Sequence, residues 1–333
     1  MYHLREGVQH RSREEVEGLL DRVRVTPRKR TEDGRQLRSV LPVQLQRHAV
    51  GPQGKVGFLV LDLHAPSRFE STYCNVRGKP LFKRQQEGTM SGYGPSTYGD
   101  EMAGVYDAWY SGGDSGAAVG TLSRLSGGGP ALELGIGTGR VALPLAAAGV
   151  EVHGIDASEA MVERLRVKAG AADIRVTVGD FTEVPVDGRF RLVFVVFNTL
   201  FALATQDDQV RCFQNVARVL EPGGRFVLEC FVPDLGRFDR GQRLAVAAID
   251  EAGVRLEASL HDPVGQRVRA RIVSITDAGT RSYPLEARYC WPAELDLMAR
   301  IAGLRLAERW GGWRGEPFTA ASSGHVTVYE KPA

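Results

Sequence analysis

The segment Pro130–Asp156 constrains the fold of this chain more than any other stretch. It begins with a short apolar run, Ala131–Leu134, which is followed by a turn of alternating glycines. A helical pattern then extends over Arg140–Ala148, and a second β-rich run, Val150–Ile155, ends on Asp156. Strand, glycine turn, helix and strand in this order predict a βαβ unit with two parallel strands.

The residues of the turn indicate a bound nucleoside. Gly135, Gly137 and Gly139 lack a Cβ atom, so the backbone can turn sharply and a ligand can approach the main chain. The following helix directs its free N–H groups and positive dipole end toward that ligand. Asp156, about 20 residues further on, is placed to accept hydrogen bonds from two ribose hydroxyls. A glycine-rich turn between two core strands, without a ligand, is the alternative interpretation.

The spacing of the glycines separates two classes of ligand. The dinucleotide fingerprint requires G-x-G-x-x-G/A, in which the third small residue packs the helix on the strand. Here that third position is Arg140, and the third glycine comes one residue earlier, at Gly139. Glu133 also stands two residues before the first glycine. The spacing therefore disfavours a dehydrogenase.

The pattern E-x-G-x-G-x-G closely resembles the first motif of class I S-adenosylmethionine (SAM)-dependent methyltransferases. Later segments agree with that family in order, so the resemblance covers roughly Tyr106 to the C-terminus. It implies an α/β fold: a Rossmann-like, seven-stranded class I methyltransferase sheet, with SAM as the cofactor. Within the family, the chain is similar to small-molecule methyltransferases of natural-product biosynthesis.

The resemblance also implies where the cofactor lies. In similar small-molecule methyltransferases a Tyr-Asp-x-x-Tyr helix covers the cofactor, and Tyr106 and Tyr110 match its spacing. Residues just past Asp156 would line the adenine pocket, and Asp180 would hydrogen-bond the adenine amino group. The cofactor contacts expected from the resemblance are Tyr106, Glu133, Gly135, Gly137, Gly139, Asp156, Ala157, Met161, Asp180, Phe181 and Phe197.

Two of these segments have structural alternatives. The stripe of Met102, Tyr106 and Trp109 is equally consistent with aromatic packing of one N-terminal helix on the core. Gly179-Asp-Phe181 would be a plain turn in most proteins, but here it follows the third predicted strand, Ile174–Val178, as in the family.

The apolar run Leu192–Phe197 is typical of a central parallel strand covered on both faces. Ligands bind beyond the carboxyl ends of such strands, so the methyl group is expected near Phe197 and Asn198. Methyltransferases that act on exocyclic amino groups of DNA bases carry an Asn/Asp-Pro-Pro-aromatic motif at this place. The residues after Asn198 include no such proline pair, which weakens a DNA-base interpretation.

Three alternating runs, Val254–Leu260, Arg267–Ile275 and Arg281–Tyr289, predict an antiparallel cap inserted after the fifth strand, at about residues 232–290. A similar three-strand cap helps to form the acceptor pocket in sugar N,N-dimethyltransferases. Alternatively, these strands form a dimerisation sheet, which would make the protein a homodimer, or they are an insertion without a functional role.

The C-terminal part reads as a helix over residues 292–303 and a closing hairpin over 304–309 and 325–330. From Leu297 onward it resembles the end of the cypemycin N-terminal methyltransferase, which modifies a peptide α-amine. The candidate substrate contacts are Tyr110, Asn198, Trp313 and Phe318, although the last two would equally pack the hairpin. His325 is expected to be a structural strand histidine, and the sequence identifies no catalytic base.

Residues 1–89 carry 17 Lys and Arg against 10 Asp and Glu, whereas the remainder carries 25 against 30. Without sustained periodicity, this segment is predicted to be a poorly ordered basic extension that precedes a methyltransferase domain at residues 90–333. The alternative is an arm that binds nucleic acid.

The four cysteines are far apart, which argues against a zinc site, an iron–sulfur cluster and a disulfide scaffold. No metal is expected, and the scattered thiols suit the cytoplasm. No apolar run approaches the ~20 residues of a membrane helix, so no membrane partner is expected.

These observations predict a SAM-dependent methyltransferase that acts on nitrogen or oxygen of a small metabolite, such as an amino sugar or another natural-product intermediate. A peptide α-N-methyltransferase and an RNA methyltransferase that uses residues 1–89 are the alternatives. A module that binds SAM without turnover is a different class that the sequence leaves open.

Overall fold

The computed structural model describes residues 92–110 and 115–333, so the prediction for residues 1–89 concerns a segment outside this range. Residues 87–333 form one compact unit. Within the described ranges, no helix is long and apolar enough to cross a membrane.

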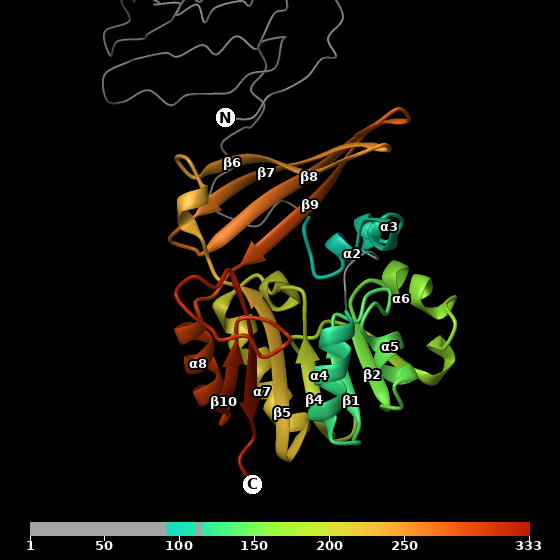
Figure 1. Ribbon diagram of the computed structural model, residues 1–333, viewed down its shortest axis with the longest axis vertical. Helices are drawn as coiled ribbons and strands as arrows, with labels where there is room; N and C mark the ends of the chain where they lie inside the picture. The colour runs from blue at the N-terminus through green and yellow to red at the C-terminus, as the bar shows by residue number, and fades with distance from the viewer. Residues whose placement is uncertain (1–91, 111–114) are drawn as a thin grey trace, which may run out of the picture. The chain divides into compact units, whose positions relative to one another are not determined.

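A seven-stranded sheet forms the centre of this unit, with the strand order β10-β11-β5-β4-β1-β2-β3 (Figure 1). The strands β1 to β5 pair in parallel, whereas β11 runs antiparallel between β5 and β10. The predicted class I methyltransferase sheet is thus confirmed. Its strands are β1 (Ala131–Leu134), β2 (Val152–Asp156), β3 (Arg175–Val178), β4 (Phe190–Val195), β5 (Leu220–Phe231), β10 (Arg305–Trp310) and β11 (Gly324–Glu330).

Helices cover both faces of this sheet. Because side chains alternate along a strand, Val193 of β4 packs in one core cluster with helices α7 and α8, while Phe194 packs in another with α4 and α5. This two-sided burial explains the unbroken apolar run of β4. The helices are α4 (Gly116–Ser126), α5 (Ala142–Ala147), α6 (Glu159–Arg166), α7 (Gln206–Val219) and α8 (Pro292–Ile301).

The segment before α4 differs from the single helix that the sequence predicts. It forms two short helices, α2 (Thr97–Met102) and α3 (Tyr106–Tyr110). The break contains Gly104, and glycine lowers the stability of a continuous helix. The 3-10 turns η1 (Ala171–Asp173), η2 (Thr199–Ala202) and η3 (Leu235–Arg237) complete the helical elements.

A second, four-stranded antiparallel sheet follows β5 and forms the cap, which lies at one end of the larger sheet (Figure 1). The sequence predicts three of its strands and misses the first, because the run Leu244–Ile249 lacks alternating polar residues. The cap strands are β6 (Gln242–Asp250), β7 (Gly253–Asp262), β8 (Arg267–Thr276) and β9 (Gly279–Arg288).

One face of the cap packs on the helices before α4. Tyr283 of β9 lies in a cluster with Met102 of α2, and its ring contacts Trp109 of α3 edge-on with 5.1 Å between the ring centres. The guanidinium of Arg255 on β7 lies 4.8 Å above the centre of the same indole ring. The side chains that share this face of β7 with Arg255 are therefore directed toward the core.

Candidate functional site

The glycine turn after β1 adopts a backbone that requires its glycines. Gly135, Gly137 and Gly139 have φ angles of 71°, 54° and 82°, a left-handed region that L side chains rarely adopt. A Cβ atom on Gly135 would lie 2.4 Å from Cγ2 of Thr199, whereas one on Gly137 would have no neighbour within 4 Å. The turn is therefore closed by packing on one side and open to a ligand at Gly137.

Asp156 stands at the end of β2 and faces this turn. Its Oδ2 accepts a hydrogen bond from the N–H of Gly137 at 2.7 Å, and its Oδ1 accepts one from the N–H of Ser158 at 2.9 Å. Burial raises the pKa of Asp156, and these two N–H donors oppose the shift. The carboxylate is thus oriented beside the glycine turn, as the nucleoside hypothesis requires.

Two side chains beside the turn, Glu133 and Arg140, have unused bonding capacity. Glu133 is 3% exposed, and its Oε2 has no hydrogen-bond partner among the described residues. Burial raises its pKa to about 8, although the positive charge of Arg140 opposes the shift. The Nε of Arg140 is likewise buried without a partner in the part of the chain that the structure describes. A buried acid and a half-buried guanidinium fit the ammonium and carboxylate groups at the amino-acid end of SAM.

Aromatic rings bring α3 and the end of β4 to the same place. The rings of Tyr106 and Tyr110 have their centres 4.9 Å apart, and Tyr110 contacts Phe197 edge-on at 5.3 Å. The guanidinium of Arg140 lies 4.8 Å above the centre of the Phe197 ring. Burial raises the pKa of the neighbouring Tyr98 hydroxyl far above its ordinary value. These rings form an apolar wall beside the glycine turn.

Two acidic side chains tie the N-terminal helices to this region. Asp107 of α3 accepts a hydrogen bond from Oγ1 of Thr138 at 2.6 Å and pairs with Nζ of Lys168 at 2.8 Å. Asp100 of α2 accepts a hydrogen bond from Oγ of Ser158 at 2.7 Å. Because Thr138 belongs to the glycine turn, α3 lies against it.

The end of β4 turns sharply at Phe197 and Asn198, whose φ angles are 57° and 65°. The N–H of Asn198 donates to the carbonyl of Glu229 at 3.1 Å, and Oδ1 of Asn198 accepts from the N–H of Phe231 at 2.7 Å. The carboxamide oxygen of Asn198 is thus used to hold β5.

The remaining predicted cofactor residues lie along the same edge of the sheet. Asp180 follows β3, and its Oδ1 accepts a hydrogen bond from the N–H of Thr182 at 2.8 Å. Phe181 is buried in the main core, and its ring lies beside Gly135. Met161 is buried in the cluster that contains Tyr283, whereas Ala157 is half-buried just past β2.

Of the two C-terminal candidates for substrate binding, only Trp313 connects to the β4 turn. Its indole Nε1 donates to Oε1 of Glu229 at 2.9 Å. Phe318 lies against His325 and Arg309 instead, at 5.8 Å from each. The Nδ1 of His325 bonds Oγ1 of Thr327 at 2.8 Å, and burial lowers the pKa of this imidazole to about 4. A neutral, buried ring is consistent with the structural role expected for it.

Sequence reasoning missed several residues of the site. Arg140 was considered only because it interrupts the dinucleotide pattern, yet it directly follows the three glycines. Glu229 is the one charged residue in the otherwise apolar run Phe226–Phe231 at the end of β5. A charge at such a position is costly unless it is used, so this was a readable signal. Asp107 is the acid of the Tyr-Asp-x-x-Tyr motif, but only the two tyrosines of that motif were considered. Lys168 gave no comparable signal, because it lies in an ordinary polar stretch.

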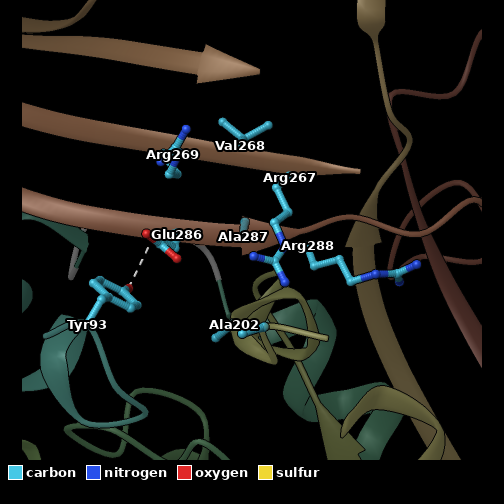
Figure 2. Close-up of a pocket in the computed structure, with 9 residues that line it drawn as sticks. Tyr93, Ala202, Arg267, Val268, Arg269, Glu286, Ala287 and Arg288 are labelled. Carbon is cyan, nitrogen blue, oxygen red and sulfur yellow. Dashed lines mark hydrogen bonds between the residues drawn. The ribbon is translucent and has the colours of Figure 1, made fainter. Parts of the chain in front are cut away.

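Figure 2 shows a pocket at the junction between the cap and the core, beneath strand β9. Within it, the N–H of Glu286 donates to the hydroxyl of Tyr93 at 3.2 Å. The pocket lies beside η2, the turn that follows Asn198, and four of its nine lining residues are charged. It is lined by Tyr93, Ala202, Ala204, Arg267, Val268, Arg269, Glu286, Ala287 and Arg288.

The fold and the glycine, acid and aromatic groups at the carboxyl edge of its sheet define a class I SAM-dependent methyltransferase, and the chain belongs to this family. A family model described as a methyltransferase domain matches residues 131–224. The cofactor is SAM, and the chain is an enzyme of the transferase class.

Particular relatives support this assignment. The chain is 30% identical to the cypemycin N-terminal methyltransferase of a Streptomyces species over 201 residues, which are 60% of this chain and 82% of that protein. It is 41% identical to the CcbJ methyltransferase from Streptomyces caelestis, with a TM-score of 0.69 over 72% of this chain and 100% of that one. The fold is also shared with CalS10, an amino pentose methyltransferase from Micromonospora echinaspora, at 22% identity and a TM-score of 0.52 over 68% of this chain and 96% of that one.

Proposed function

We propose that this enzyme transfers a methyl group from SAM to nitrogen or oxygen of a small polar metabolite, such as an amino sugar or another natural-product intermediate. The observation that carries the proposal is the chemistry of the cap face that is directed toward the core. Arg255, Glu257 and Ser259 are spaced two residues apart along β7, so their side chains lie on the same face of the cap. Glu257 pairs with Arg243 of β6 at 2.9 Å, and Ser259 is buried.

A sheet face that only packed on the core would gain from apolar side chains, because buried polar groups cost free energy unless they are paired. The half-buried pair of Arg243 and Glu257 supplies both a hydrogen-bond donor and an acceptor. Hydroxyls and an amine on a small acceptor are the groups that such a pair binds well.

The residues near the cofactor would contribute alignment and exclusion of water. When bound, SAM supplies the electrophilic methyl group. Asp156 would hold the ribose, while Glu133 and Arg140 would hold the amino-acid end. Tyr106, Tyr110 and Phe197 would shield the acceptor atom from water, which favours attack by an uncharged amine. Holding the acceptor beside Phe197 would keep its nucleophilic atom in line with the methyl group, which lowers the entropic part of the activation barrier.

A peptide α-amine is a second candidate acceptor, and one specific observation favours it. The relative that this chain matches over 82% of its length is named as an N-terminal methyltransferase of cypemycin. A peptide terminus and an amino sugar present the same nucleophile and differ in size and in neighbouring groups.

An RNA acceptor stays a prediction that depends on residues 1–89, and the cytoplasmic location and the homodimer also stay predictions.

A labelled-methyl screen distinguishes these candidates. The purified chain is incubated with SAM that carries a labelled methyl group and with three sets of acceptors: amino sugars, their N-acetylated forms, and short peptides with a free or acetylated terminus. Mass spectrometry then detects methylated products. We expect methylation of free amino sugars and none of the N-acetylated forms. Methylation confined to peptides would favour the second candidate, and transfer to the acetylated sugars would indicate an oxygen acceptor.

A further inference from the structure

The turn at Phe197 and Asn198 requires a cause. Two consecutive residues other than glycine adopt left-handed backbone angles there. L side chains rarely adopt this conformation, and it persists only where the surrounding structure fixes it. The turn lies where β4 ends, which is the position expected for the transferred methyl group.

Glu229 of β5 supplies most of what fixes this turn. Its Oε2 accepts a hydrogen bond from the N–H of Phe197 at 2.8 Å, and its main-chain carbonyl accepts one from the N–H of Asn198 at 3.1 Å. The other carboxylate oxygen, Oε1, accepts the indole N–H of Trp313 at 2.9 Å. Hydrogen bonds to an ionised carboxylate are among the stronger ones in proteins.

The two groups that share this carboxylate belong to different parts of the site. Phe197 is 40% exposed, although its ring contacts Tyr110 and Arg140 beside the glycine turn. Trp313 belongs to the glycine-rich segment 311–318, and its carbonyl accepts a hydrogen bond from Oγ1 of Thr121 of α4 at 3.0 Å. One side chain therefore joins the cofactor side of β4 to this C-terminal segment.

We propose that Glu229 is a positioning residue for methyl transfer: it holds Phe197 at the boundary between cofactor and acceptor and couples that residue to segment 311–318. The proposal rests on the proposed function only in that an acceptor binds beside Phe197. Glu229 acts through its two hydrogen-bond donors and does not itself touch the reacting atoms.

Glu229→Gln is the informative variant, because the amide keeps the shape of the side chain. Its single oxygen can accept only one of the two donors, and its NH₂ group faces the other. We expect kcat for the acceptor found in the screen to fall about 10- to 100-fold, because small displacements in aligned sites have effects of that size. Calorimetric Kd values for SAM and S-adenosylhomocysteine should stay within about threefold, because no cofactor group bonds Glu229 directly. Trp313→Phe removes only one donor and should give a smaller loss.

A second readout needs no acceptor. In ¹⁵N-tryptophan spectra, the Trp313 indole resonance is identified by its loss in Trp313→Phe. Saturation with S-adenosylhomocysteine should shift this resonance in the native chain and leave it unchanged in Glu229→Gln. Amide hydrogen exchange in the peptide that contains Phe197 should be faster in the variant. Glu330→Gln is the matched control, because Glu330 pairs with Arg305 at the other end of the same sheet.

The outcomes separate the two proposals. If the native chain methylates none of the acceptors, the proposed function fails, and the indole and exchange measurements still decide the role of Glu229. If Glu229→Gln lowers the Tm but leaves kcat within twofold of the native value, Glu229 is only structural. If S-adenosylhomocysteine does not shift the Trp313 indole resonance of the native chain, the coupling is refuted as well.

Discussion

At the scale of single residues, two carboxyl groups beside the glycine turn are the main polar features of the site. Asp156 is oriented by two backbone N–H groups, and Glu133 is buried with one oxygen unpaired. These are different tasks, because the Asp156 carboxylate already accepts two hydrogen bonds, whereas Oε2 of Glu133 has no partner among the described residues and can accept one from a ligand. Two experiments test them separately.

Replacing Asp156 by Asn should weaken the binding of SAM at least about tenfold, because a charge-assisted acceptor for the ribose hydroxyls is lost. Titration calorimetry with SAM and S-adenosylhomocysteine measures the change. The exposed neighbour Glu159 gives the matched control, Glu159→Gln, which should leave both Kd values unchanged. Native affinity in Asp156→Asn would rule out its role at the ribose.

Glu133 should make cofactor binding depend on pH. Its pKa of about 8 in the free chain means that it is mostly protonated at neutral pH. The ammonium group of SAM favours the ionised form, so binding should release a proton and affinity should rise as the pH approaches 8. Calorimetry in buffers of different ionisation enthalpy measures the released proton. Glu133→Gln should lose this release, and an unchanged proton count in that variant would contradict the assignment.

At the scale of elements, α3 and the cap each depend on a small set of polar contacts. The sequence predicts that an aromatic helix lies near the cofactor, because the spacing of Tyr106 and Tyr110 is local information. It does not show that Asp107 bonds Thr138 and Lys168, since those partners come from distant segments. The first cap strand, β6, is missed for a related reason: its pairing with β7, rather than its own pattern, defines it.

Replacing Asp107 by Asn should loosen α3 without unfolding the chain. The ion pair with Lys168 is partly exposed, so we expect the free energy of unfolding to fall by less than about 1 kcal/mol. Dissociation of S-adenosylhomocysteine, followed by stopped-flow fluorescence, should become several-fold faster, because a lid that is less well held opens more often. Glu101→Gln on the exposed side of α2 is the control. Equal dissociation rates in all three chains would show that α3 does not retain the ligand.

The junction of the cap with α7 and α8 depends on Arg288. Its Nη2 pairs with Oε1 of Glu294 at 2.7 Å, and its Nη1 donates to Gln209 and to Sγ of Cys290 at 3.1 Å. Arg288→Met should reduce the free energy of unfolding by about 3–5 kcal/mol, because one half of a largely buried pair is left behind. Urea denaturation measures this loss, and exposed Arg281→Met on the same strand should change little.

At the scale of the whole molecule, the sequence predicts the fold better than it predicts the site. The glycine turn, Asp156 and the apolar strand β4 are recognisable because each follows from local pattern, and the family resemblance that they carry implies the seven-stranded sheet. Glu229 and Arg140 act across strands and loops, so their partners become visible only when β4, β5 and α3 are brought together. For the same reason Phe318 was grouped with Trp313, although the structure places it against His325.

A chain that starts at Glu87 should retain SAM binding and methyl transfer, because residues 87–333 form one compact unit that contains every residue of the candidate site. Calorimetry and the labelled-methyl assay compare it with the full chain. Loss of transfer to RNA alone would revive the nucleic-acid alternative, and loss of SAM binding would show that residues 1–86 support the fold.

The position of β11 has a consequence for folding during translation. The strand Gly324–Glu330 follows every other strand of its sheet in the sequence and is therefore synthesised after them, yet it lies between β5 and β10 in the completed sheet. Until it leaves the ribosome, β5 has an open apolar edge and β10 has no partner in that sheet. The βαβ half can form during translation, since domains fold as their residues emerge. The other half must wait until β11 has emerged, so a chain truncated before Gly324 keeps an unpaired strand edge, which is prone to aggregate.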